Sequence, residues 1–191
     1  MKNYFIIHGS FGSPFGNWFP WLYEKIEESK QKGMEEPICY VPEFPTGVGF
    51  QNYENWENLL LFYAKTGKFN EKSIIFAHSI APIFICKFLI KNKIKVKRLV
   101  FVCGFNDYVI PGADDYNKVN KSMFCKNFAD VKKYCDDIVC FYSNNDPYVP
   151  FAKEKEFADA IANESFVIQG GGHLNKSAGF DKFDELKKYI G

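Results

Sequence analysis

Short apolar stretches alternate with helix-like segments along this chain of 191 residues, and this alternation constrains its fold more than any other feature. The pattern predicts six strands, over residues 4–7, 38–41, 73–77, 98–103, 138–142 and 166–168. It predicts helices over residues 18–32, 53–65, 82–92, 128–135, 151–162 and 180–189, and an irregular connection over residues 104–127. Strands that alternate with helices form a parallel sheet, and right-handed crossovers put helices on both of its faces. We therefore expect an α/β fold with a mostly parallel six-stranded sheet, built as one domain over residues 1–191.

The third predicted strand runs into the segment Ala77-His78-Ser79-Ile80-Ala81, and a helix is predicted directly after it. A serine with small residues two positions before and after it, between a strand and a helix, is typical of a nucleophile elbow. In that turn the strained backbone presents the serine Oγ above the edge of the sheet. Ala77 and Ala81 are small enough, although glycine is the more usual occupant. Ser79 is therefore the predicted nucleophile of a serine hydrolase.

A serine nucleophile needs a histidine base, and the chain has only three histidines. His78 adjoins Ser79 and is expected to point away from it, while His8 lies in the loop after the first strand. His173 follows the last strand and three consecutive glycines, which allow the loop to bring the imidazole over the sheet edge. We expect His173 to be the base, and the simpler alternative is a histidine in a surface loop.

Asp146 is the predicted acid that orients this histidine, because it follows the fifth strand in the segment SNNDPYVP. The chain order Ser79, Asp146, His173 is the order found in α/β-hydrolases. The alternative is an Asx-type turn, which an aspartate before proline often forms. The reserve candidates for the acid follow the fourth strand and are Asp107, Asp114 and Asp115.

An oxyanion hole needs backbone N–H groups aimed at the developing negative charge. The N–H of Ile80, beside the nucleophile, is the first expected donor. The second should come from the loop His8-Gly9-Ser10-Phe11-Gly12, where Ser10 is preferred over Phe11. A plain glycine-rich turn is the alternative for this loop. Its glycines lack the spacing of a dinucleotide-binding fingerprint, and no phosphate-binding lysine follows them.

The charge balance gives no reason to expect nucleic acid or an anionic membrane as a partner, because 24 basic and 23 acidic residues leave a net charge of +1. No apolar stretch approaches the roughly 18 residues of a membrane span. The six cysteines are scattered without a C-x-x-C pair, which favours free thiols in a reducing compartment. We therefore expect a cytoplasmic protein that needs no metal and no cofactor; protein partners stay open.

Five segments carry a family resemblance over almost the whole chain: IIHG at 6–9, NWFPWL at 17–22, AHSIA at 77–81, NDPYVP at 145–150 and GGHLN at 171–175. With them the chain resembles the small serine hydrolases of the retinoblastoma-binding-protein-9 type, within the α/β-hydrolase superfamily. The second segment is the most particular to that family. The resemblance implies a minimal α/β-hydrolase core and a triad at Ser79, Asp146 and His173. Ala77 departs from the family pattern, in which glycine is commoner.

The expected reaction is acyl transfer to water, with small carboxylic esters as the first substrate class and small aromatic amides or peptides as the second. An apolar or aromatic acyl pocket is expected from side chains near the connection over residues 104–127, namely Phe105, Tyr108, Val109, Met123, Phe124 and Phe128. Trp18 and Trp21 share one helix face, and they either pack in the core or line the site entrance.

Two alternatives to hydrolysis belong to other classes of function. A non-catalytic protein-binding scaffold on the hydrolase fold is the main alternative, but the chain has no L-x-C-x-E motif for retinoblastoma-type binding. A nucleotide-binding domain is the other, and it lacks the glycine and acid spacing that such a site needs.

Overall fold

The computed structural model describes residues 2–29, 37–107 and 114–190. Within them, six strands are formed by β1 (Asn3–Ile7), β2 (Ile38–Tyr40), β3 (Ile74–His78), β4 (Arg98–Val102), β5 (Ile138–Ser143) and β6 (Glu164–Ile168). The α-helices are α1 (Phe19–Glu28), α2 (Tyr53–Lys65), α3 (Ala81–Asn92), α4 (Asp114–Asn120) and α5 (Phe151–Ile161). Three 3₁₀ helices follow the same chain order: η1 (Phe128–Lys133), η2 (Lys176–Ala178) and η3 (Asp184–Tyr189).

All strands pair in parallel, in the order β2-β1-β3-β4-β5-β6. The chain first builds outward from β1 to β2, then crosses back to β3 and builds the other half of the sheet. The order therefore reverses between β1 and β3, and ligands of open α/β sheets bind at such a point, beyond the carboxyl ends of the strands. The loops that follow β1 and β3 contain Gly9 and Ser79, respectively.

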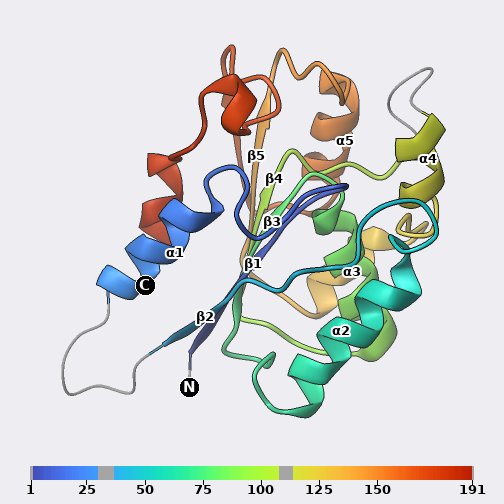
Figure 1. Cartoon of the computed structure of the whole chain (residues 1–191), viewed down its shortest axis with the longest axis vertical. Helices are drawn as coiled ribbons and strands as arrows, with labels where there is room; N and C mark the ends of the chain where they lie inside the picture. Colours follow the sequence, from blue (N-terminus) through green and yellow to red (C-terminus); the bar gives the residue numbers. More distant parts are fainter. Residues whose placement is uncertain (1, 30–36, 108–113, 191) are drawn as a thin grey trace.

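Helices cover both faces of the sheet, as the sequence predicts (Figure 1). The helix α1 lies on one face with the C-terminal segment, and α2, α3 and α5 lie on the other. Alternate residues of a strand enter opposite cores: Phe5 and Ile7 face α2 and α3, whereas Tyr4 and Ile6 face α1. Because buried parallel strands are apolar on both sides, β1, β3 and β4 read as continuous hydrophobic runs.

Two predicted helices differ in type from those observed. The segment over residues 128–135 forms a six-residue 3₁₀ helix packed against α3 and α5. The helix predicted over residues 180–189 begins only at Asp184, since Phe183 has an extended backbone with φ −138° and ψ +84°. Such short helices gain their stability from packing, and the sequence pattern does not distinguish the two types.

The other predicted elements differ from the observed ones at their ends. The helix α1 begins one residue after Trp18 and ends at Glu28, and the predicted continuation to residue 32 lies mostly outside the described residues. The strand β6 is two residues longer than predicted at its start. Among the helices that the structure describes, none is both long enough and apolar enough to span a membrane.

Candidate active site

Ser79 occupies the sharp turn between β3 and α3 with a φ of +64°. This left-handed backbone is unfavourable for a non-glycine residue and persists only where the surroundings hold it. The Ser79 N–H donates to the carbonyl of Val102 in β4 at 2.9 Å. On the other side, a Cβ at Gly9 would lie 2.6 Å from the Ser79 Cβ. The turn is thus held against both neighbouring strand ends, and only glycine fits at position 9.

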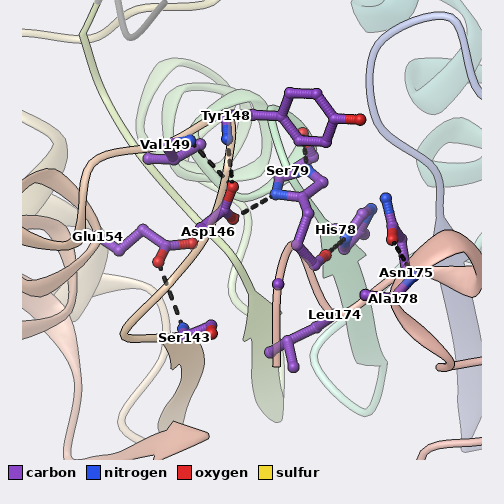
Figure 2. Close-up of polar contacts among 12 residues, drawn as sticks. His78, Ser79, Ser143, Asp146, Tyr148, Val149, Glu154, Leu174, Asn175 and Ala178 are labelled. Carbon is purple, nitrogen blue, oxygen red and sulfur yellow. Dashed lines mark hydrogen bonds and ion pairs between the residues drawn. The ribbon is translucent and has the colours of Figure 1, made fainter. Parts of the chain in front are cut away.

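The side chains of Ser79, His173 and Asp146 form one continuous hydrogen-bonded chain (Figure 2). His173 Nε2 lies 3.1 Å from Ser79 Oγ, and His173 Nδ1 lies 2.5 Å from Asp146 Oδ2. An ionised carboxylate only accepts hydrogen bonds, so His173 Nδ1–H donates to Asp146 and Nε2 is left as an acceptor for the Ser79 hydroxyl. This geometry lets the imidazole take a proton from Oγ.

Asp146 is held in its ionised form by donors on both oxygens. Its Oδ1 accepts from the backbone N–H groups of Tyr148 at 2.7 Å and Val149 at 3.0 Å, and its Oδ2 accepts from His173. Burial alone would raise the pKa of Asp146, but the bonds from His173 and the two amides outweigh it and lower the pKa. A permanent negative charge therefore lies behind the imidazole.

Two asparagines tie the loop of Asp146 to the loop of His173. Asn144 Oδ1 accepts the N–H of Gly170 at 2.8 Å, and Asn145 Oδ1 accepts the N–H of Gly172 at 2.8 Å. Gly172 has a φ of +56°, and a Cβ there would lie 2.8 Å from the Cβ of Ala178. The glycine run therefore adopts one ordered path, fixed by side chains that directly precede Asp146.

The two predicted oxyanion donors both lie at this end of the sheet. Ile80 directly precedes α3, and Ser10 lines the same cavity as Ser79. The described residues offer no protein acceptor to the backbone N–H of either. The Phe11 N–H, in contrast, donates to Gln51 Oε1 at 3.0 Å. Of the backbone N–H groups of Ser10 and Phe11, that of Ser10 is therefore the one left for a ligand.

The other two histidines are buried and structural. The backbone N–H of Phe44 donates to His8 Nε2 at 3.1 Å, so the ring proton is on Nδ1, 2.9 Å from the carbonyl of Gly9. His78 Nε2 lies 2.9 Å from the carbonyl of His173 and donates to it. Burial lowers the pKa of His8 and lowers that of His78 to about 3. Both rings are therefore neutral, and His78 positions the backbone of His173, a contact that the sequence did not indicate.

Glu154 of α5 lies directly behind Asp146 and was not singled out from the sequence. Glu154 is only 1% exposed. Its Oε2 accepts the Ser143 N–H at 3.3 Å (Figure 2), and its Oε1 has no hydrogen-bond partner among the described residues. Burial, and then the negative charge of Asp146, raise the pKa of Glu154 to about 9. Two neighbouring buried carboxyls do not both ionise, so Asp146, with three donors, holds the charge and Glu154 holds a proton.

The described residues include two clusters with metal-ligand atoms within 4.8 Å of one another: His78 with Cys103 and His173, and Cys103 with Asp146, Glu154 and His173. Both share His173 with the chain of hydrogen bonds that leads to Ser79. Burial raises the pKa of the Cys103 thiol well above its usual value, which disfavours the thiolate that metals bind. A metal ion in the larger cluster would also have to break the contact between Asp146 and His173.

The reserve acids lie elsewhere. Asp107 forms an ion pair with Lys153 at 2.8 Å, and Asp114 and Asp115 are exposed in the first turn of α4. None of them contacts His173 in the described structure. Asp146 is the carboxylate that the fold brings to the imidazole.

A cavity of about 230 Å³ opens over Ser79 and His173. The predicted apolar wall is largely wrong, since Phe105 lines this cavity but Met123 is buried in the core and Phe124 and Phe128 pack against that core. Positions 108 and 109 lie outside the described residues. Asparagines line the cavity beside Tyr116, Tyr148 and Val149, and no lysine, arginine, aspartate or glutamate among the described residues does so.

The tryptophans of the first helix belong to the core and not to the entrance. Trp18 and Trp21 are buried beneath α1, and neither lines the cavity. The indole N–H of Trp18 donates to the carbonyl of Leu174 at 3.1 Å. The start of α1 therefore supports the loop that bears His173.

Comparison with known proteins places this geometry in context. A family model for serine hydrolases matches residues 4–191. No curated protein matches the sequence.

Several solved structures share the fold. The ydeN gene product from B. subtilis superposes with a TM-score of 0.80 at 22% identity, covering 100% of this chain and 97% of that one. Est1E from Butyrivibrio proteoclasticus, solved with ferulic acid bound, gives 0.69 at 15% identity over 100% and 86% of the two chains. An extracellular α/β-hydrolase from a Paenibacillus species gives 0.60 at 15% identity over 91% and 92%. At these identities the likeness establishes an α/β-hydrolase-like fold.

Proposed function

The chain belongs to the serine hydrolase family, and we propose that it hydrolyses small carboxylic esters through an acyl-enzyme intermediate on Ser79. The observation that carries this proposal is the chain of hydrogen bonds from Ser79 through His173 to Asp146, at the floor of a cavity. A strained nucleophile, a base within reach of its proton and an ionised acid behind the base are the parts that acyl transfer needs.

Acylation begins when His173 Nε2 takes the proton of Ser79 Oγ as the oxygen attacks the ester carbonyl carbon. The new C–O bond converts the carbonyl oxygen into an oxyanion. His173 then gives its proton to the leaving alkoxide as the old C–O bond breaks. Asp146 stabilises the imidazolium without taking its proton.

Deacylation repeats these steps with water. His173 takes a proton from the attacking water and gives it to Ser79 Oγ as the acyl C–Oγ bond breaks, which releases the carboxylic acid and restores the Ser79 hydroxyl. The backbone N–H groups of Ser10 and Ile80 are the proposed oxyanion donors in both halves. Their support is their position beside Ser79 and their lack of a protein acceptor.

The cavity is small and its described lining residues include no lysine, arginine, aspartate or glutamate, which favours uncharged substrates with short acyl groups. Small amides stay the second substrate class, because the same groups cleave them when the leaving amine is protonated. Membership of the retinoblastoma-binding-protein-9 type stays a prediction from the sequence, carried chiefly by the NWFPWL segment at the start of α1.

Hydrolysis of the p-nitrophenyl esters of acetate, propionate and butyrate tests the proposal. We expect turnover by the wild type and a loss of about 10⁶-fold in kcat on Ser79→Ala, the scale on which a serine nucleophile acts. Equal turnover by both proteins would overturn it. A folded wild type with no activity would favour a binding scaffold instead.

A further inference from the structure

Asn120, the last residue of α4, is a cavity residue that the sequence did not indicate. It is 4% exposed and lines the cavity with Ser79. A buried amide must have its donors and acceptor accounted for, because an unsatisfied polar group is costly to bury. The hydrogen bonds of Gln51 and Ser10 determine which terminal atom of Asn120 is the oxygen and which is the nitrogen.

Gln51, in the loop before α2, has an amide whose orientation is fixed by the backbone of Phe11. Its Oε1 accepts the backbone N–H of Phe11 at 3.0 Å, and because a backbone N–H can only donate, this atom is the oxygen. The other terminal atom is therefore the nitrogen. Gln51 Nε2 donates to Asn120 Oδ1 at 3.1 Å.

Ser10 provides a second donor to Asn120. Its hydroxyl donates to the same Asn120 Oδ1 at 2.5 Å. The oxygen of Asn120 thus accepts two hydrogen bonds from inside the protein and has no capacity left for a ligand. The Nδ2 group is the part of Asn120 that stays available.

That Nδ2 group faces the cavity. No described residue accepts a hydrogen bond from it, and it is not among the fully buried atoms that lack a partner. It therefore meets open space, and the open space beside Asn120 is the cavity over Ser79. The same cavity lacks charged side chains among its described lining residues, so its counterpart on a substrate is an uncharged oxygen.

We propose that Asn120 recognises the substrate, by donating a hydrogen bond from Nδ2 to an ether, hydroxyl or carbonyl oxygen carried by the acyl group. This inference rests on the proposed function and refines it. The preferred substrates are small esters whose acyl chain bears an uncharged oxygen, in place of plain hydrocarbon chains of the same size.

A pair of nearly isosteric substrates tests the inference: p-nitrophenyl methoxyacetate and p-nitrophenyl butyrate differ by one ether oxygen in place of a methylene. The measured quantity is the ratio of their kcat/KM values. Their different intrinsic reactivity cancels when this ratio is compared between wild type and variants. One hydrogen bond to substrate changes the ratio by about three- to tenfold.

Two variants remove the donor by different routes. Asn120→Asp keeps an oxygen for Ser10 and Gln51 but replaces Nδ2 with an acceptor. Gln51→Glu keeps the acceptor for Phe11 but offers Asn120 a second carboxylate oxygen, so the Asn120 amide turns over to donate to it and presents its own oxygen to the cavity. Asn117→Asp, on the same helix and in the same cavity, is the matched control for the added charge.

We expect both donor-removing variants to lose the preference for methoxyacetate by about three- to tenfold, while Asn117→Asp keeps the wild-type ratio. Circular dichroism confirms folding, and Gln51→Glu carries the test if Asn120→Asp does not fold. A folded Asn120→Asp or Gln51→Glu with the wild-type ratio would overturn the inference. Failure of the proposed function is a different result, in which the wild type cleaves neither ester.

Discussion

The two walls of the active-site cavity are built in different ways. One wall consists of two loops, after β5 and β6, which carry Asp146 and His173 and are joined by hydrogen bonds from the two asparagines that precede Asp146. The other wall joins three segments that are distant in sequence, through Ser10, Gln51 and Asn120. The first contains an ionised carboxylate and an imidazole, while the second offers neutral amides and backbone N–H groups.

This difference separates chemistry from recognition. Damage to the wall of Asp146 and His173 should act on the chemical step, because these groups move protons and hold charge. On the other wall the proposed oxyanion donor Ser10 also serves the chemical step, whereas damage to the Gln51 or Asn120 amide should act on which substrate is preferred.

Among the variants that compare the two walls, Asp146→Asn should have the largest effect. An amide keeps the shape but can donate to His173 Nδ1, which stabilises the wrong tautomer and removes the charge behind the imidazole. We expect kcat to fall by about 10⁴-fold with little change in KM. Asp107→Asn, at the reserve acid that pairs with Lys153, is the control and should retain activity. A loss of less than tenfold in Asp146→Asn would show that this wall does not carry the charge.

Glu154 should govern the pH dependence of stability. Burial raises its pKa to about 9 in the folded protein, from an ordinary value of 4.5, so the folded state holds a proton that the unfolded state releases between these values. Stability contributed by this group is complete below pH 4.5 and is lost as the pH rises through 9, by about 1.4 kcal/mol per pH unit in between, several kcal/mol in all.

Glu154→Gln mimics the protonated carboxyl and cannot ionise. Urea unfolding between pH 5 and 9 should therefore show a free energy of unfolding that falls more steeply with pH in the wild type than in this variant. Parallel curves for the two proteins would mean that Glu154 is ionised in the folded state.

Gly9→Ala should damage the nucleophile from the opposite wall. The new methyl would lie 2.6 Å from the Ser79 Cβ, so the turn must shift. A displacement of about 1 Å costs roughly 10²-fold in kcat. Gly16→Ala is the matched control in the same loop, since its Cβ would lie 3.5 Å from the nearest atom. Equal activity of the two variants would contradict the close packing described at Ser79.

The smallest expected effect is on Asn145→Ala, which removes the acceptor for the Gly172 N–H. One such hydrogen bond contributes about 1 kcal/mol to stability. We expect the midpoint of thermal unfolding to fall by a few degrees, together with a modest loss of kcat, because the loop of His173 is then less ordered. An unchanged midpoint would show that Asn145 does not join the two loops.

The sequence predicted the layered parallel sheet because strand length, apolar runs and alternation with helices are local properties. It also pointed to Ser79, Asp146 and His173, since each follows the end of a strand and such ends meet at one sheet edge. The structure brings these three side chains into contact, and their catalytic roles stay proposed.

The features that the sequence did not yield depend on distant contacts. Glu154 reads as an ordinary helix position, and only packing against the strand ends buries it behind Asp146. Asn120 and Gln51 are separated by 69 positions, and nothing local marks their pairing. The apolar wall was wrong for the same reason, because Met123 reads as hydrophobic but does not reveal which cavity or core it enters.

Intact-mass analysis after incubation with a fluorophosphonate, with wild type and Ser79→Ala in parallel, shows whether Ser79 is an activated nucleophile. This probe reacts preferentially with activated serines, so we expect one adduct on the wild type, mapped to the peptide that contains Ser79, and none on the folded variant. A folded wild type without an adduct, or an adduct that persists in Ser79→Ala, would contradict the assignment of Ser79 as the nucleophile.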